Sequence, residues 1–227
     1  MRGDVSVVLP VYDRASGVAE LIARLRAALP AAGLEIVLVH DGGPPESLET
    51  LRALADSDSS VRVVELAENQ GQNAAVLAGL RRTGGDLVVV MDADLQDPPE
   101  AVPSLLAAIR GRWDTAFGGR RGAYEARGRL AGSRALKLLL HLLSRRRLPA
   151  DAGLFVAMRR DVVERLLCVH TREPYVVGLL VHVGGRMTSL PVPRLPAPDA
   201  GSGYGAVARL RLARRAIATV SRPPRGA

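Results

Sequence analysis

One segment of this chain carries more information than any other: Val88-Val89-Val90-Met91-Asp92-Ala93-Asp94-Leu95-Gln96-Asp97-Pro98-Pro99-Glu100. It begins with a short apolar run, which predicts a buried strand. Two carboxylates one residue apart follow, then a glutamine, then a Pro-Pro-Glu sequence that is able to open a helix. Residues two apart in a strand lie on the same face, so Asp92 and Asp94 should point at one place just beyond the end of the strand.

The chemistry of this segment suits a divalent cation. Open α/β sheets bind their ligands outside the carboxyl ends of their strands. Asp92, Asp94 and Gln96 offer hard oxygen ligands for Mg²⁺ or Mn²⁺, which water and substrate phosphates would complete. A lone Asp-x-Asp pattern also fits a solvated strand end, because so short a pattern often matches by chance. The rest of the chain has to decide between the two interpretations.

The first half of the chain alternates between two kinds of hydrophobic pattern. Short apolar runs predict strands over residues 5–11, 35–39, 61–66 and 87–91. Helical spacing and start signals predict helices over residues 16–29, 44–55 and 70–82. This βαβαβαβ order with short connections predicts a parallel, doubly wound sheet with helices on both faces.

The second half is less regular. We expect strands over residues 114–117, 152–158 and 187–191, and helices over residues 123–143, 161–167 and 206–220. There is no internal repeat and no convincing linker. A length of 227 residues therefore predicts a single domain, or at most two small ones, with a substantial core.

The charge is strongly positive, with a formal net value of +8. Lys137 is the single lysine, so arginine, which binds phosphate in a bidentate manner, supplies the excess. The charge suits phosphorylated substrates, acidic lipid surfaces or nucleic acid, and it also fits a bias in genome composition. Aromatic residues make up only 3% of the chain, which argues against a base-stacking surface and a nucleic-acid partner.

Targeting and redox signals are weak. Cys168 is the single cysteine, which excludes an intramolecular disulfide and a cysteine zinc site and fits a reducing compartment. Residues 1–9 begin a strand and do not resemble a signal peptide. No apolar run approaches the roughly 18 residues of a membrane span. We expect a cytoplasmic protein that is either soluble or peripheral on the inner face of the membrane.

Polar residues follow three of the predicted strands at the same edge of the sheet. They are Tyr12 and Asp13 after the first strand, His40 and Asp41 after the second, and Asp92, Asp94 and Gln96 after the fourth. Each group alone fits a turn or a helix cap. Because the carboxyl ends of parallel strands meet in one crevice, the three groups together predict a single ligand site.

At this point the chain resembles the GT-A-fold glycosyltransferases of family 2, and within them the polyprenyl-phosphate glycosyltransferases of the dolichol-phosphate mannose synthase group. The resemblance covers nearly the whole chain. It is carried by residues 7–12, 37–43, 69–75 and above all 92–100, with weaker matches at 118–121, 151–153 and 201–204.

The resemblance implies one GT-A glycosyltransferase domain over residues 1–227. Residues 1–118 would be the half that binds the nucleotide sugar, and residues 119–227 the acceptor-side half. The implied fold is a Rossmann-like, doubly wound, mostly parallel sheet flanked by helices, with a less regular C-terminal half.

The resemblance also implies an activity: inverting, metal-dependent transfer of a sugar from a nucleotide-diphosphate sugar to a polyprenyl phosphate. Mg²⁺ or Mn²⁺ would be held by Asp92, Asp94 and Gln96 and would neutralise charge on the leaving group. The implied donor-binding residues are Pro10, Tyr12, Asp13, His40, Asp41, Gln72, Asp92 and Ala93.

The implied catalytic residues are Asp151, Arg120 and Arg129. Arg120, Arg127 or Arg129 would bind the acceptor phosphate or the leaving diphosphate. A lipid phosphate is already ionised and needs no strong base, whereas a hydroxyl acceptor needs one, and Asp151 is the candidate. Asp151 fits a structural turn equally well.

The sequence departs from the family pattern at several places. Asp13-Arg14 stands where Asn-Glu is usual, and residues 40–43 read His-Asp-Gly-Gly instead of Asp-Asp-Gly-Ser. Val156 replaces an arginine, and Gly203 replaces a lysine. These departures leave open a soluble GT-A enzyme that acts on a small-molecule acceptor.

Two other classes fit less well. A sugar-phosphate nucleotidyltransferase should carry a glycine-rich, basic loop after the first strand, and residues 12–17 are a poor match. The intact Asp92-x-Asp94-x-Gln96 pattern argues against a non-catalytic binding protein.

Two contacts with partners are also open from the sequence. One is a homodimer. The other is a peripheral membrane contact, made by the arginines of residues 145–147 or by a basic helix over residues 206–220 that packs on the fold with its arginines toward lipid.

Overall fold

The structure is a computed structural model, and it describes residues 4–13, 15–121, 136–171, 174–193 and 206–221. One sheet of seven strands runs through the whole described part, in the order β3-β2-β1-β4-β6-β5-β7. The strands are β1 (Val5–Val11), β2 (Leu34–Asp41), β3 (Val61–Leu66), β4 (Leu87–Val90), β5 (Thr115–Arg121), β6 (Val156–Arg159) and β7 (Met187–Pro193).

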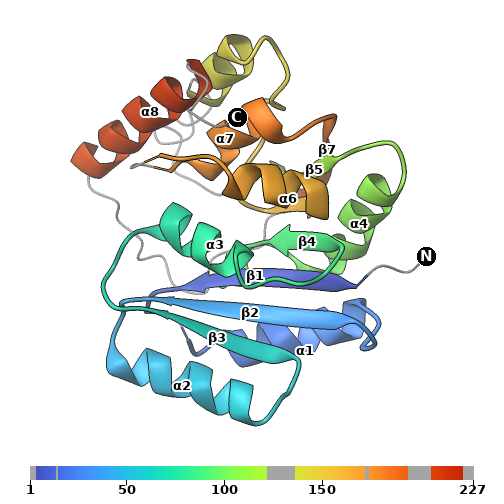
Figure 1. Cartoon of the computed structure of the whole chain (residues 1–227), viewed down its shortest axis with the longest axis vertical. Helices are drawn as coiled ribbons and strands as arrows, with labels where there is room; N and C mark the ends of the chain where they lie inside the picture. The colour runs from blue at the N-terminus through green and yellow to red at the C-terminus, as the bar shows by residue number, and fades with distance from the viewer. Residues whose placement is uncertain (1–3, 14, 122–135, 172–173, 194–205, 222–227) are drawn as a thin grey trace.

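The sheet is parallel except for β6, which pairs antiparallel with β4 on one side and β5 on the other. In Figure 1 the first three strands lie in the lower part of the view, and the strands of the second half lie above them. The expected doubly wound, mostly parallel sheet is therefore confirmed.

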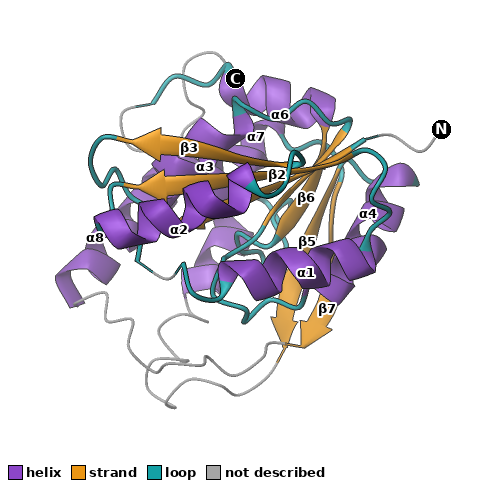
Figure 2. Cartoon of the chain, turned by 90° about the horizontal axis from the view of Figure 1, so that it is seen from below, coloured by secondary structure: helices purple, strands orange, loops and turns teal. Residues whose placement is uncertain are grey.

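Helices cover both faces, because alternate residues of the apolar strands face opposite layers. One core joins the sheet to α1 (Val18–Ala28), α2 (Pro45–Asp56) and α4 (Val102–Arg110). The other core joins it to α3 (Gln72–Leu80), α6 (Arg160–Leu167), α7 (Val176–Val183) and α8 (Ala206–Ser221). Figure 2 shows the sheet between its helices, with the carboxyl end of β5 beside that of β7.

Several boundaries differ from those expected. β4 ends at Val90, so Asp92 lies two residues beyond the strand. β2 continues to Asp41, and β5 to Arg121. The expected helix start at residues 98–100 is present as a short 3-10 helix, η1 (Pro99–Ala101), that leads into α4. Residues 136–143 are helical, and the remainder of the helix expected over residues 123–143 lies outside the described residues.

The helix α7 has no counterpart among the expected elements. Its eight residues are an apolar run rich in valine, a pattern that fits a strand as well as a helix. Contacts with other elements stabilise the helical form. The side-chain oxygen of Asn73 accepts a hydrogen bond from the backbone N–H of Val176 at 2.9 Å and so satisfies one donor at the helix start. Gly178 gives α8 room to approach, because a Cβ there would meet Thr219.

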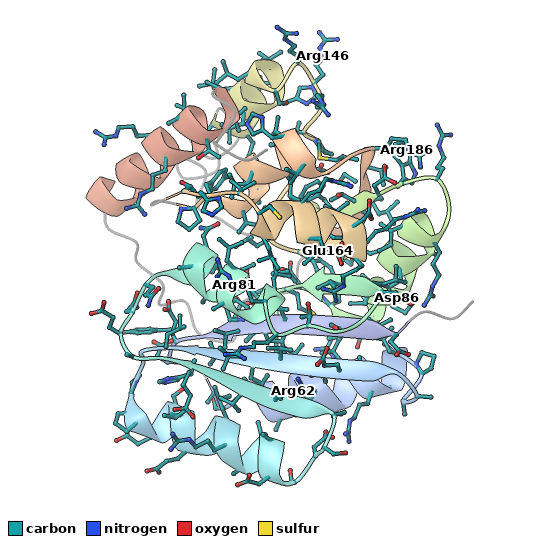
Figure 3. The ribbon with its side chains drawn as sticks, viewed as in Figure 1. Arg62, Arg81, Asp86, Arg146, Glu164 and Arg186 are labelled. Atoms are coloured by element: carbon teal, nitrogen blue, oxygen red, sulfur yellow. The ribbon has the colours of Figure 1, made fainter. Side chains whose placement is uncertain are left out.

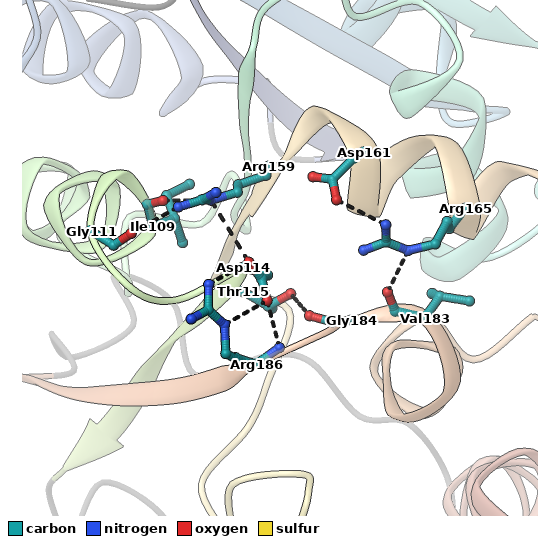
Figure 4. Close-up of polar contacts among 10 residues, drawn as sticks. All are labelled: Ile109, Gly111, Asp114, Thr115, Arg159, Asp161, Arg165, Val183, Gly184 and Arg186. Carbon is teal, nitrogen blue, oxygen red and sulfur yellow. Dashed lines mark hydrogen bonds and ion pairs between the residues drawn. The ribbon is translucent and has the colours of Figure 1, made fainter.

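The amino-terminal ends of β5 and β7 are joined by a polar network (Figure 4). The carboxylate of Asp114 accepts hydrogen bonds from the backbone N–H of Arg186 at 2.8 Å and from its guanidinium at 3.2 Å. The hydroxyl of Thr115 donates to the carbonyl of Gly184 at 2.7 Å, and the Arg159 guanidinium donates to the carbonyl of Ile109 at 2.7 Å. Arg186 holds the pKa of Asp114 below its ordinary value. This network lies at the edge of the sheet opposite to the carboxyl ends of β4 and β5.

Within the part of the chain that the structure describes, no helix combines the length and the apolar character that crossing a membrane requires.

Candidate active site

The segment after β4 lies at the carboxyl edge of the sheet. Met91 and Ala93 are buried, while Asp92 and Asp94, which alternate with them, are partly exposed. This alternation leaves both carboxylates on the open side of the segment, as the spacing of the two residues predicts, although neither belongs to the strand.

Both carboxylates are held by hydrogen bonds. The amide Nε2 of Gln72, the first residue of α3, donates to Oδ1 of Asp92 at 2.5 Å. The backbone N–H of Gln96 donates to Oδ1 of Asp94 at 3.0 Å, across a turn in which Leu95 has a φ of 60°. The two acidic side chains are therefore oriented by α3 and by their own turn.

The end of β2 contributes a buried acid. Asp41 is 4% exposed, and its Oδ1 accepts a hydrogen bond from the backbone N–H of Gln70 at 2.8 Å. Burial raises the pKa of the Asp41 carboxyl, and the hydrogen bonds from the backbone of Gln70 and Gly71 oppose that shift. The neighbouring His40 is equally buried, and its Nε2 has no hydrogen-bond partner among the described residues.

The ends of β1 and β2 are packed together through glycine. A Cβ on Gly43 would overlap the carbonyl of Tyr12, and Gly42 has a φ of +61°, which glycine adopts without strain. This close approach places Tyr12, which is 48% exposed, next to the buried pair that ends β2. Pro10 and Asp13, which the sequence predicts to bind the donor, lie within β1 and just after it.

The end of β5 forms a third part of the edge. A Cβ on Gly119 would overlap both Oδ2 of Asp151 and Oγ of Ser189. These two oxygen atoms therefore lie directly against the backbone of β5. The hydroxyl of Ser189 is buried and has no hydrogen-bond partner within the described part of the chain.

The sheet register relates Asp151 to Asp92. Val156 of β6 pairs with Val90 on one side and with Phe117 on the other. Asp92 and Gly119 each lie two residues beyond that level, toward the same edge. Two strand spacings separate β4 from β5, so the Asp151 carboxylate lies roughly 10 Å from the end of β4.

The other predicted site residues have different outcomes. Ala93 is buried, and Gln72 contacts Asp92 directly. Arg120 belongs to the backbone of β5, but its side chain lies outside the description, as do Arg127 and Arg129 as whole residues. Sequence reasoning missed Ser189, which carries no recognisable signal. The pair Gly118-Gly119 inside a strand is a sign of close backbone approach and could have indicated the contact with Asp151.

The edge offers the carboxylates of Asp92 and Asp94 to a cation. Among the described residues no three His, Cys, Asp or Glu side chains cluster as a complete metal cage. A site of this kind fits Mg²⁺ or Mn²⁺, which keep water and substrate phosphates as further ligands.

Comparison with known proteins agrees with this geometry. The family described as "Glycosyl transferase family 2" matches residues 6–167. Proteins of Salmonella paratyphi A and Salmonella dublin, each named undecaprenyl-phosphate 4-deoxy-4-formamido-L-arabinose transferase, are 33% identical over 191 residues. That alignment covers 83% of this chain, and the chain spans only 58% of the length of those relatives.

Solved structures share the fold. Glucosyl-3-phosphoglycerate synthase from Mycobacterium tuberculosis, in complex with Mn²⁺ and UDP, superposes with a TM-score of 0.70 at 21% identity and covers 96% of this chain and 79% of its own. A mannosyltransferase from Pyrobaculum calidifontis, in complex with GDP-mannose and Mn²⁺, gives a TM-score of 0.65 at 19% identity over 97% of this chain and 74% of its own. By its sequence match and its fold, the chain belongs to glycosyl transferase family 2 and has the GT-A architecture.

Proposed function

We propose that this chain transfers a sugar from a nucleotide-diphosphate sugar to a polyprenyl phosphate, with inversion at the anomeric carbon and with Mg²⁺ or Mn²⁺. The observation that carries the acceptor class is the 33% identity to relatives named as undecaprenyl-phosphate transferases. The donor class is supported by the family and by the carboxylates at the carboxyl edge of the sheet. We expect the transfer to occur on the cytoplasmic side of the membrane.

The two halves of the chain would divide the work. Residues 1–118 would bind the donor, because β1, β2 and β4 bring Tyr12, Asp41 and Asp92 to one edge. Residues 119–227 would bind the acceptor, with Asp151 beside β5 on the far side of that edge.

Asp92, Asp94 and Gln96 would hold the metal. The two partly exposed carboxylates and their orienting hydrogen bonds support this assignment. When bound, the cation supplies charge neutralisation for the leaving nucleoside diphosphate.

The donor would be oriented by residues of β1, β2 and α3. Asp41 would accept a hydrogen bond from the nucleoside. The exposed ring of Tyr12 and Nε2 of His40, which has no hydrogen-bond partner among the described residues, would line the same side of the donor site. Pro10, Asp13, Gln72 and Ala93 complete the proposed donor contacts.

The acceptor half would supply cations and a carboxylate. Arg120 and either Arg127 or Arg129 would bind the acceptor phosphate or the leaving diphosphate through charge-assisted hydrogen bonds. An ionised phosphate attacks without a strong base. Asp151 would take a proton only from a hydroxyl acceptor.

A second function, transfer to a small-molecule acceptor, is favoured by one observation. Val156, at a position where the family favours arginine, is fully buried in β6 and packs in the core on the α3 side. A cation for a lipid phosphate is therefore missing at this position.

The deciding experiment is a donor screen. The protein is incubated with Mg²⁺ or Mn²⁺ and a panel of labelled nucleotide sugars, with and without a short polyprenyl phosphate. Label that moves into organic solvent only when the lipid is present supports the proposal. Donor turnover that gives only water-soluble product would favour the small-molecule acceptor, and no turnover with any donor would contradict both.

A further inference from the structure

Residues 136–143 form a helix with an uncovered apolar face. Leu138, Leu139, Leu142 and Leu143 are 54%, 42%, 52% and 40% exposed, whereas Leu140 is 2% exposed and packs in the core. Residues four apart lie on one side of a helix, so the four leucines form one continuous stripe. Apart from Tyr12, they are the only exposed large hydrophobic side chains of the described residues.

Three arginines follow this stripe, separated from Leu143 by one residue. Arg145, Arg146 and Arg147 are all exposed, and Figure 3 shows Arg146 at the end of the molecule opposite to Arg62. In water, four exposed leucines beside three cations bring no stabilisation. On a bilayer, an interfacial helix faces apolar chains and anionic headgroups together, so both kinds of residue make favourable contacts.

Two of these arginines have an unusual backbone conformation. Arg145 and Arg146 have φ values of 53° and 63°, in the left-handed region that normally takes glycine at a helix end. Backbone N–H groups of Arg145 and Arg146 donate to the carbonyls of Leu142 at 3.0 Å and His141 at 2.8 Å, which fixes this turn. Non-glycine residues in such positions cost free energy and concentrate at functional sites.

The same turn is tied to the proposed acceptor side. His141 Nδ1 donates to the carbonyl of Leu148 at 2.7 Å, and the backbone N–H of Leu148 donates to the hydroxyl of Ser144 at 3.1 Å. Leu148 is buried, and Asp151 follows three residues later against β5. The leucines and arginines are therefore close in sequence to Asp151, and their turn is hydrogen-bonded to the segment that leads to it.

The described C-terminal part of α8, residues 213–221, offers less to a membrane. Its residues Ala216 and Val220 are buried in the core, and His182 of α7 contacts the carbonyl of Thr219 at 2.8 Å. Over residues 213–221, the part of α8 whose side chains are described, the apolar side is thus covered by the fold itself.

We propose that Leu138, Leu139, Leu142, Leu143 and Arg145–Arg147, here called the leucine–arginine surface, dock on an anionic lipid bilayer. The leucines enter the boundary of the acyl chains, and the arginines bind headgroup phosphates. This inference rests on the proposed function, because a polyprenyl phosphate reaches the enzyme from a bilayer.

The test is flotation of the full chain with vesicles of phosphatidylcholine and phosphatidylglycerol at low salt. Arg145→Gly/Arg146→Gly removes two charges where glycine suits the backbone, so the fold should be at least as stable. Each arginine removed should weaken binding about fivefold, the equivalent of about 1 kcal/mol per basic residue. Leu138→Gln/Leu142→Gln should reduce binding at every salt concentration. The matched control is Arg81→Gln/Arg82→Gln, an equal charge change at exposed residues that should leave flotation unchanged.

Three outcomes would overturn the inference. In the first, both variants of the leucine–arginine surface float with vesicles like the wild type. In the second, the control variant loses as much vesicle binding as the surface variants. In the third, light scattering shows that the wild type is a dimer and that Leu138→Gln/Leu142→Gln converts it to a monomer. Turnover of polyprenyl phosphate in detergent separates this inference from the proposed function. Vesicle binding without lipid turnover leaves the docking surface supported and rejects the acceptor, whereas turnover in detergent without vesicle binding does the reverse.

Discussion

Three carboxylates at the carboxyl edge of the sheet each accept an orienting hydrogen bond. Asp41 receives the backbone N–H of Gln70, Asp92 receives the amide of Gln72, and Asp94 receives the backbone N–H of Gln96. When hydrogen bonds hold metal-binding or catalytic side chains in place, removing the residues that make those hydrogen bonds lowers activity. The supporting residues are therefore as informative to mutate as the carboxylates.

Gln72→Ala should lower turnover about 10- to 100-fold, the usual cost of removing a hydrogen bond that orients a metal ligand. The fold should persist, because the side chain lies at the first turn of α3 and only partly buried. The matched control is Gln70→Ala, since Gln70 acts through its backbone N–H and its side chain is exposed. Steady-state kinetics that show equal activities for the two variants would reject the role of Gln72.

Asp41→Asn should weaken nucleotide binding by about 1–3 kcal/mol, because a charged hydrogen-bond partner is lost. In the ligand-free protein, the same substitution should not lower the stability of the fold. Burial raises the folded-state pKa of Asp41 above its ordinary 3.8, so ionised Asp41 costs stability once the pH exceeds that raised pKa. The variant should therefore unfold at an equal or higher temperature at neutral pH, and its advantage should shrink as the pH falls through the raised pKa.

Calorimetric titration with a nucleoside diphosphate and thermal unfolding at two pH values measure both effects of Asp41→Asn. Unchanged nucleotide affinity would contradict the binding role, whatever the melting temperature does.

Gly119→Ala tests the contact between β5 and the acceptor side. The added methyl group would overlap Asp151 and Ser189, so the Asp151 carboxylate has to move and the protein should lose about 1–3 kcal/mol of stability. Gly153→Ala is the control, because a Cβ there meets nothing within 4 Å. Chemical denaturation that gives equal stabilities for the two variants would show that the contact at Gly119 is relaxed at no cost.

At the scale of the elements, the second half of the sheet depends on Asp114. This residue joins β5, β6 and β7 through Arg186 and Arg159 (Figure 4). Asp114→Asn should cost about 1–2 kcal/mol at neutral pH, because charge-assisted hydrogen bonds to a mostly buried carboxylate are lost. Asp161→Asn on α6, whose pair with Arg165 is exposed, should cost less.

The pH dependence of this effect has a defined sign. Arg186 lowers the folded-state pKa of Asp114 below the 3.8 expected for the unfolded chain. The stabilisation is therefore complete above pH 3.8 and is lost as the pH falls through the lower, folded-state pKa. Unfolding of wild type and Asp114→Asn should converge in strong acid, and a constant difference down to that range would contradict the assignment.

Most elements could be predicted from hydrophobic periodicity alone, because apolar strands such as β1 and β3 alternate with amphipathic helices such as α1. The helix α7 could not, since its state is set by Asn73 and by packing on α8 rather than by its own pattern. The convergence of Tyr12, Asp41 and Asp92 on one edge follows from parallel strands. The approach of Asp151 and Ser189 to Gly119 depends on register in the irregular half, which local sequence does not encode.

At the scale of the whole molecule, the Asp114 network and the proposed ligand contacts lie at opposite edges of one sheet. The Asp114 network closes the amino-terminal edge of β5 and β7, whereas Asp92, Asp41 and Asp151 lie at the carboxyl edge. A net charge of +8 would also favour the approach of the proposed anionic donor and acceptor to this domain. Substitution of Asp114 should consequently affect folding, whereas substitution of Asp92 should affect transfer.

The central claim is that the carboxyl edge binds a divalent cation together with a nucleoside diphosphate. The most direct measurement is calorimetric titration of Mn²⁺ into the protein, with and without UDP or GDP, for the wild type and for Asp94→Ala. The described residues offer two carboxylates and no complete metal cage, so the wild type should bind Mn²⁺ alone weakly and much more tightly when one of the nucleotides is present. Asp94→Ala should lose this gain in affinity and should still unfold at the wild-type temperature. Equal binding of Mn²⁺ and nucleotide by folded Asp94→Ala would contradict the claim.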